Sequence, residues 1–340
     1  MREKIGANEV LMVDNRREEN RIPREFHSKI DALTLFEGTS GLLKITPETL
    51  RNKRLAIIRG GDGTTAYLLN MRYLAQKLYG DEETDISFLH EGGGSANTLL
   101  NGLMRQEKAE IPNSLKEVFP SNLYEARRYF PLQGEYSAKI AHFAYLVGLG
   151  HLTVEITKKK EDYAKKHGKI EDLSKVYIQG GIESLRSLKK RVEPLRVSFR
   201  DGSNISHEQG LLAASEIITV PRLGTFNFKE LIPDEKIRLL TVAAKSEAGL
   251  FYKFLVTLLV GGNFSDGADR LIRMGILKSR DVDTVTAIPD RRKKHVGEDN
   301  VCFDGELRRV ESEMKLQRSS MAVTFIIPRQ LVRDFKGGFS

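Results

Sequence analysis

The first part of the chain alternates short apolar runs with amphipathic stretches. The runs Glu9–Val13, Arg54–Ile58 and Ile86–Leu89 are bounded by polar residues, which is typical of strands in a buried sheet. Between Thr65 and Leu78, apolar residues recur at helical spacing, and a second apolar helix is expected from about Asn97 to Met104. The pattern predicts a strand–loop–helix unit used twice, and therefore an α/β domain.

From about residue 145 the apolar positions alternate with a period of two. Leu195, Val197 and Phe199 alternate with polar residues up to Asp201-Gly202, a hairpin-turn signal, and the same alternation runs from Met321 to Ile327. This part is therefore predicted to be mostly antiparallel sheet. Helical interruptions are expected at Lys158–His167, Ser184–Lys190 and Ala248–Val260.

Composition narrows the cellular setting. The chain has 340 residues and one cysteine, Cys302, which cannot form an internal disulfide. Its longest apolar stretch, Phe251 to Gly262, is interrupted by Lys253 and is shorter than the roughly 20 residues that span a bilayer. The start of the sequence does not resemble a secretion signal. We therefore expect a cytoplasmic protein, with peripheral membrane contact as an open alternative.

The charge favours phosphate-rich partners. The formal net charge is +8, and basic residues cluster at 158–166, 186–196 and 291–295. Each cluster alone is typical of a solvated surface, but together they favour an anionic membrane. No interleaved aromatic residues or nucleic-acid motif accompany them, so nucleic acid is not expected as a partner.

The sharpest motif is Gly60-Gly61-Asp62-Gly63-Thr64, between a predicted strand and a predicted helix. Glycines let a backbone approach an anion closely, and the N–H groups at a helix start favour phosphate. A carboxylate in such a loop would repel phosphate unless a cation lay between them, so Asp62 is interpreted as a Mg²⁺ contact. The alternative is a plain turn, but the full motif in this context favours phosphate binding.

Two further motifs are weaker on their own. The run from Gly92 to Asn97 occupies the equivalent place after the next strand, where Ser95 and Asn97 could equally cap a helix. Late in the chain, Asp304-Gly305-Glu306 follows an apolar run, and its spacing alone favours a hairpin turn with an exposed glutamate.

The order of these motifs resembles the diacylglycerol kinase catalytic family, which includes bacterial lipid kinases and sphingosine kinases. The resemblance runs from about Arg54 to Pro328; the first loop is shared with NAD kinases and phosphofructokinases, and the late Asp-Gly-Glu favours lipid kinases. It implies a Rossmann-like α/β nucleotide-binding domain at 1–145, a mostly antiparallel β-sandwich at 146–320, and a C-terminal segment, 321–340, that returns to the first domain.

The resemblance also implies roles for particular residues. It places Gly60, Gly61, Asp62, Gly63 and Thr64, with Ser95 and Asn97, against the phosphates of ATP, makes Glu306 the base that takes the acceptor's proton, and offers Asp234 as the metal ligand. Where the family has an Asn-Pro turn after its first strand, this chain has Asp14-Asn15-Arg16-Arg17.

The function implied is transfer of the γ-phosphate of MgATP to the hydroxyl of a lipid acceptor, such as a diacylglycerol or a sphingoid base. There are two alternatives: an NAD kinase-like enzyme with a soluble substrate, and a nucleotide- or lipid-binding protein without catalysis. A homodimer is compatible with each of these functions. The seven histidines are scattered and do not have the spacing of a zinc site.

Overall fold

The structure is a computed structural model that describes residues 9–15, 34–92, 98–99, 102–103, 124–167, 173–187, 191–223, 226–261, 267–289, 291–292 and 300–328. Contacts within the chain define two compact units. Unit 1 is Met1–Tyr129 together with Met321–Ser340, and unit 2 is Phe130–Ser320.

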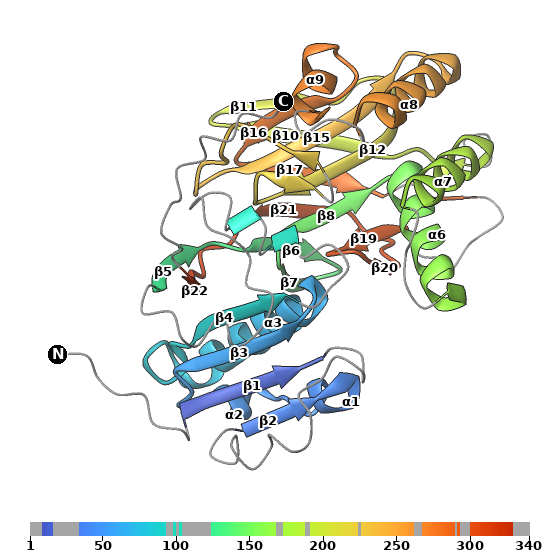
Figure 1. The fold of residues 1–340 in the computed structure, drawn as a ribbon. Helices are drawn as coiled ribbons and strands as arrows, with labels where there is room; N and C mark the ends of the chain where they lie inside the picture. Colours follow the sequence, from blue (N-terminus) through green and yellow to red (C-terminus); the bar gives the residue numbers. More distant parts are fainter. Residues whose placement is uncertain are drawn as a thin grey trace, which may run out of the picture. The chain divides into compact units, whose positions relative to one another are not determined.

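Unit 1 contains a six-stranded sheet with the order β2-β1-β3-β4-β22-β5 (Figure 1). Neighbouring strands are parallel except for β22 and β5, which are antiparallel. The predicted apolar runs form its centre, since all five residues of β1 are buried and five of the six in β3. The strands are β1 (Val10–Asp14), β2 (Thr34–Glu37), β3 (Leu55–Gly60), β4 (Ser87–Gly92), β5 (Tyr124–Tyr129) and β22 (Val323–Pro328).

The main helix of unit 1 follows β3 directly. Helix α3 (Asp62–Tyr79) starts three residues before the predicted position, because Asp62 to Thr64 form its first turn. Its buried face includes Thr65, Leu68, Arg72 and Ala75, at the spacing that turns one side of a helix inward. Shorter elements are α1 (Gly38–Leu42), α2 (Pro47–Leu50) and the 3₁₀ helix η4 (Glu82–Thr84). The predicted helix after β4 is helical at 98–99 and 102–103, and its ends lie outside the described residues.

Unit 2 is a sandwich of two antiparallel six-stranded sheets, as predicted. One sheet has the order β11-β10-β17-β21-β6-β7 and the other β16-β15-β12-β8-β19-β20. Val197, Val285 and Leu316 from the first sheet pack with Val147 and Leu239 from the second in one buried cluster. The strands are β6 (Leu132–Tyr136), β7 (Lys139–Phe143), β8 (Leu146–Leu149), β9 (Arg191–Glu193), β10 (Arg196–Asp201), β11 (Asn204–His207), β12 (Leu211–Ile218), β13 (Arg222–Leu223), β14 (Phe226–Asn227), β15 (Ile237–Ala244), β16 (Lys278–Val282), β17 (Thr284–Ile288), β18 (Arg291–Arg292), β19 (Val301–Phe303), β20 (Glu306–Arg308) and β21 (Met314–Arg318).

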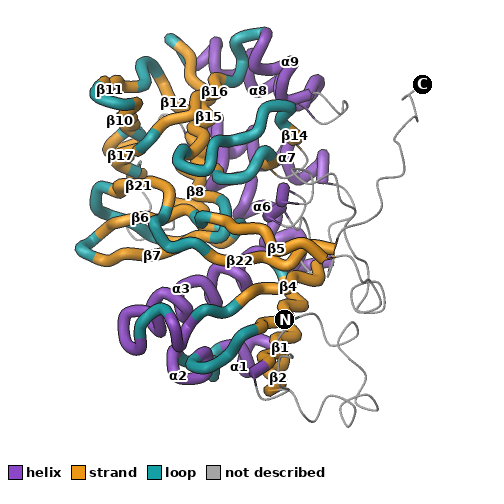
Figure 2. The backbone as a smooth tube through the Cα atoms, turned by 90° about the vertical axis from the view of Figure 1, so that its left-hand side faces the viewer, coloured by secondary structure: helices purple, strands orange, loops and turns teal. Residues whose placement is uncertain are grey.

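Four helices form a third layer in unit 2, on the outer face of the second sheet (Figure 2). They are α6 (His151–His167), α7 (Leu173–Ser187), α8 (Glu247–Gly261) and α9 (Gly267–Arg273). Helix α6 packs on β8, β12 and β19, and α8 packs on β15. In the described part of the chain, no helix combines the length and apolarity needed to cross a membrane.

Helix α7 differs from its prediction. It begins at Leu173 rather than Ser184, whereas the predicted end falls on residues outside those described. Its interior contains Gly180-Gly181, a pair that is unfavourable in an isolated helix. Packing explains the pair: a Cβ on Gly181 would lie 1.6 Å from the ring of Phe254 in α8, and one on Gly180 would lie 2.7 Å from Ile156 Cα in α6. The glycines allow three helices to approach one another closely.

Candidate phosphate-binding site and second-unit motifs

The first glycine motif lies where β3 ends and α3 begins. Gly60 closes β3, Gly61 precedes the helix, and the N–H groups of the first turn point out of the helix start. A Cβ on Gly60 would lie 2.7 Å from Thr64 Oγ1, so the backbone of Gly60 and the Thr64 side chain need this position to be glycine. The turn is therefore compact, and it lies at a helix start, which suits a bound phosphate.

The second glycine motif begins beside the first. Gly92 at the end of β4 is the register partner of Gly60 at the end of β3. The Asp62 carboxylate, which is 8% exposed, joins the two motifs by accepting the backbone N–H groups of Thr98 at 2.9 Å and Leu99 at 3.2 Å. Asp62 thus holds the helical turn that follows the second motif, a role that the sequence did not indicate. Ser95 and Asn97 lie outside the described residues.

Asn15 directly follows β1, a third strand that ends at this edge of the sheet, and the sequence did not single it out as a site residue. Its backbone N–H donates to the carbonyl of Arg59 at 2.8 Å, and its side-chain Nδ2 donates to Thr64 Oγ1 at 3.0 Å. Beneath it, Arg59 Nη1 and Asp14 Oδ2 form a buried ion pair of 2.6 Å between β3 and β1. The sequence held one signal for Asn15: it is a polar residue directly after a predicted parallel strand, and the ends of such strands share one edge of the sheet.

In unit 2, the Asp304-Gly305 pair forms the predicted hairpin turn. Both residues have positive φ, 50° and 91°, and β19 pairs with β20 across them, which describes a two-residue type I′ turn. Glu306 opens β20 with its side chain exposed and accepts a hydrogen bond from Arg308 Nη2 at 2.6 Å. Its role as a base remains a prediction.

Asp304 is not an ordinary exposed turn residue. It is 7% exposed, and its carboxylate accepts three backbone N–H groups from the connection between β7 and β8: Ala144 at 2.7 Å, Tyr145 at 2.9 Å and Leu146 at 3.0 Å. Three N–H donors satisfy a buried carboxylate well and fix the connection to the hairpin. Within the motif, Asp304 is therefore buried and stabilises the turn, whereas Glu306 is exposed.

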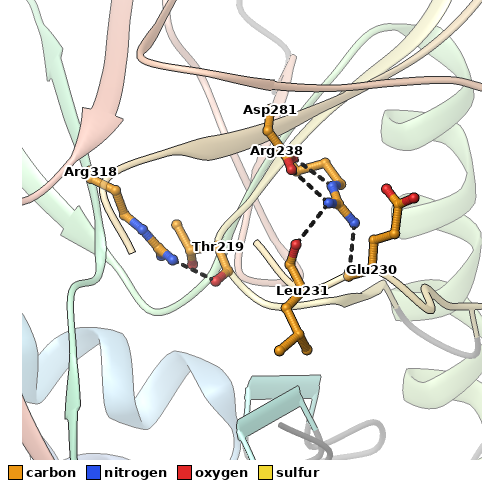
Figure 3. Close-up of polar contacts among 6 residues, drawn as sticks. All are labelled: Thr219, Glu230, Leu231, Arg238, Asp281 and Arg318. Carbon is orange, nitrogen blue, oxygen red and sulfur yellow. Dashed lines mark hydrogen bonds and ion pairs between the residues drawn. The ribbon is translucent and has the colours of Figure 1, made fainter. Parts of the chain in front are cut away.

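Asp234, the predicted metal ligand, lies exposed in the loop before β15. Two arginines hold main-chain carbonyls of this loop, and Figure 3 shows the contacts of Arg238 with Glu230 and Leu231. Arg238 donates to the carbonyls of Glu230 at 3.0 Å and Leu231 at 3.1 Å, and makes two 2.7 Å contacts to the Asp281 carboxylate. Arg318 donates to three carbonyls: Asp234 at 3.0 Å, Phe130 at 2.9 Å and Thr219 at 3.0 Å. The loop is thus fixed through its backbone.

Each predicted metal-binding carboxylate has the chemistry that Mg²⁺ prefers. Within the described ranges, no three His, Cys, Asp or Glu side chains gather in a group that could hold a metal ion. Mg²⁺ is usually bound through one or two carboxylates together with substrate phosphates and waters. Asp62 in unit 1 and Asp234 in unit 2 are each a carboxylate of that kind, and Asp62 already accepts two N–H groups. Strand β15, which follows the Asp234 loop, is separated in its sheet from β20, which Glu306 opens, by β12, β8 and β19.

One partly buried glutamate in unit 2 was not predicted. Glu216 on β12 lies opposite Gly148 of β8, and its Oε1 accepts a hydrogen bond from Thr153 of α6. Its Oε2 is enclosed without a hydrogen-bond partner, and burial raises the pKa of Glu216 to about 8. On the other side of Gly148, Cys302 of β19 is enclosed as well, and burial raises the pKa of its thiol to about 12. These groups form a buried polar row beneath α6.

Comparison with known proteins places the fold. No protein-family model matches the sequence, and no curated protein matches it. Two solved structures from Bacillus anthracis str. Sterne, each described as a candidate diacylglycerol kinase, align over 94% of this chain and 96% of their own, with TM-scores of 0.53 and 0.52 and identities of 14% and 15%. The chain therefore has the fold of these structures, an α/β unit combined with an antiparallel β-sandwich, as the resemblance implied.

Proposed function

We propose that this protein is an ATP-dependent kinase that transfers the γ-phosphate of MgATP to the hydroxyl of a lipid acceptor. The observation that carries the proposal is the glycine motif at the end of β3, which lies beside Gly92 at the end of β4 and whose Asp62 carboxylate accepts the N–H group of Thr98. Adjacent strand ends of an open parallel sheet are where such folds bind ligands, and a helix start beside them favours phosphate.

In the proposed reaction, unit 1 binds the nucleotide. The N–H groups at the start of α3 and the Thr64 hydroxyl would hold phosphate oxygens, while Asp62 holds the N–H groups of Thr98 and Leu99. The predicted Mg²⁺ ligand is Asp234, and the ion would neutralise charge on the phosphoryl oxygens. Positioning and electrostatic stabilisation account for most of the catalysis in reactions of this class.

Unit 2 would supply the group that acts on the acceptor. An alcohol is a weak nucleophile at neutral pH, and a carboxylate within hydrogen-bond reach assists by taking its proton. Glu306 is exposed, so its carboxylate can meet a substrate, and Asp304 fixes the hairpin from which it projects. The β19–β20 turn therefore supports the assignment of Glu306 as the general base.

Peripheral contact with an anionic membrane belongs to the same proposal, in a cytoplasmic protein. Near the Gly181–Phe254 contact, α7 exposes Ile178 and Ile182, and α8 exposes apolar side chains that include Phe251 and Leu255. Helix α6, which packs on α7, carries the lysine-rich segment 158–166. Exposed apolar side chains with cationic neighbours suit an anionic lipid surface.

The test is phosphate transfer from γ-labelled ATP to defined acceptors. The protein is incubated with MgATP and either mixed vesicles containing diacylglycerol and sphingoid bases, or NAD. The proposal predicts label in the organic phase with the lipids and none in NADP. Label in NADP alone would show a soluble-substrate kinase, and ATP binding without transfer to either acceptor would show a non-catalytic nucleotide-binding protein.

A further inference from the structure

Asn15 contacts Thr64, a residue of the proposed phosphate-binding turn, but has no role of its own in the proposed function. Asn15 follows β1, Thr64 belongs to the first turn of α3, and their side chains meet at 3.0 Å with Asn15 Nδ2 as the donor. The Asn15 main chain is fixed independently by its N–H bond to the Arg59 carbonyl. The contact therefore joins a rigid strand end to the residue that closes the first glycine motif.

The direction of this hydrogen bond decides what the threonine can do. A hydroxyl has one proton and two lone pairs. Because Asn15 donates to Thr64 Oγ1, the hydroxyl proton of Thr64 must point away from Asn15. Oγ1 also lies above Gly60, where a Cβ would come within 2.7 Å, so the hydroxyl is located at the phosphate-binding turn itself.

We infer that Asn15 is a positioning residue for the nucleotide: it orients the Thr64 hydroxyl as a donor to a phosphate oxygen. The inference rests on the proposed function, since it takes the turn to bind a phosphate chain. A hydroxyl that donates to an anionic oxygen makes a stronger bond than one between neutral groups. Without Asn15, the Thr64 hydroxyl can rotate to other acceptors, such as the carbonyl one helical turn before it.

The test is a double-mutant cycle on MgATP affinity. Dissociation constants are measured for the wild type, Asn15→Ala, Thr64→Val and the double variant, with adenosine as the ligand that lacks phosphates. Asn15→Ala should weaken MgATP binding about 5-fold, the value of one ordinary hydrogen bond, and leave adenosine binding unchanged. In the Thr64→Val background it should have no further effect, because Asn15 acts only through that hydroxyl.

Two more variants provide the controls. Thr64→Ser keeps the hydroxyl, so Asn15→Ala should cost about the same 5-fold in that background. Asn15→Asp should weaken MgATP binding more than Asn15→Ala does, because a carboxylate accepts a hydrogen bond from the Thr64 hydroxyl and repels phosphate. Thermal denaturation of each variant without nucleotide shows that the fold is intact.

The outcomes separate the two levels of the argument. If the wild type binds MgATP but the two substitutions are additive, or if Asn15→Asp binds MgATP as the wild type does, the inference about Asn15 is wrong and the proposed function stands. If the wild type binds no nucleoside triphosphate, both are wrong.

Discussion

At the scale of single residues, Glu216 shows how an enclosed carboxylate makes stability depend on pH. Its pKa is raised to about 8, mainly because desolvation of the carboxylate disfavours the charged form. An unfolded glutamate titrates near 4.3, so between that pH and about 8 the unfolded chain binds fewer protons at this site than the folded one. Stability contributed by this site is therefore complete below the lower value and is lost as pH rises towards 8.

Glu216→Gln should remove this dependence. At pH 5 the variant and the wild type should have similar free energies of unfolding, and by pH 8 the variant should be more stable by about 3–4 kcal/mol, because each pKa unit corresponds to about 1.4 kcal/mol and the amide cannot ionise. Denaturant unfolding at several pH values measures the difference. Glu135→Gln, at an exposed strand position in β6, is the matched control and should show no trend. If the free energies of unfolding of Glu216→Gln and the wild type differed by the same amount at every pH, the raised pKa of Glu216 would be wrong.

Glu306 gives the residue-scale prediction for catalysis. Glu306→Gln should lower kcat by roughly 10²–10⁴-fold, because proton removal contributes about that much, and should leave MgATP affinity unchanged. Steady-state kinetics and equilibrium nucleotide binding measure the two quantities. Glu313→Gln, at an exposed position shortly after β20, serves as the control and should keep full turnover. Wild-type turnover in Glu306→Gln would remove Glu306 from the mechanism.

At the scale of elements, two Asp-Gly hairpins of unit 2 have different roles. Asp304 in the β19–β20 turn is buried and binds three N–H groups, whereas Asp201, beside the β10–β11 turn, is 58% exposed and pairs with Lys236 at 2.5 Å. Surface ion pairs contribute little, while a buried carboxylate that accepts several N–H groups contributes more. The same dipeptide therefore only marks the turn in the β10–β11 hairpin, whereas in the β19–β20 hairpin its aspartate also binds the neighbouring backbone.

Asparagine substitutions should separate these two roles. Asparagine tolerates positive φ as aspartate does, so the turn geometry is preserved. Asp304→Asn places an NH₂ group against a backbone N–H and should lower the free energy of unfolding by about 1–3 kcal/mol. Asp201→Asn should change it by less than about 1 kcal/mol. Chemical denaturation of both variants checks this, and equal losses would show that burial of Asp304 does not matter.

Elements whose pattern is local were predictable, and those set by distant contacts were not. The apolar runs of β1, β3 and β4 and the helical period of α3 follow from burial on one sheet, so the sequence alone predicts them. The start of α7 was missed because Gly180-Gly181 resembles a break until Phe254 is seen against it. The burial of Asp304 was missed because its partners lie 158 to 160 residues earlier.

The candidate site divides in the same way. Gly60 to Thr64 were found because glycine, carboxylate and position after a strand all agree in one short segment. Asn15 could not be selected with confidence from the sequence, because a single polar residue after a strand is common and its partner, Thr64, is 49 positions away. The link from Asp62 to Thr98 likewise depends on the pairing of β3 with β4.

At the scale of the whole molecule, the surface charge and the exposed apolar side chains predict where the protein binds. The full chain should sediment with vesicles rich in phosphatidylglycerol and much less with phosphatidylcholine alone, and added salt should weaken the binding because it screens the +8 net charge. Phe251→Ser/Leu255→Ser, on α8, should reduce binding several-fold. The control is Ile140→Ser/Ile205→Ser, which changes two exposed isoleucines outside these helices. If both double variants lost vesicle binding equally, the membrane contact would lie elsewhere than on α8.

Strand β22 carries a consequence for how the protein is made. It lies between β4 and β5 in the sheet of unit 1, yet its residues come almost 200 positions after those of β5. While a ribosome is still synthesising the sandwich, β4 and β5 have been made but the strand that pairs with both has not. The proposed nucleotide-binding sheet can therefore be completed only after the whole of unit 2 has emerged, because β22 follows unit 2 in the chain and pairs with both β4 and β5.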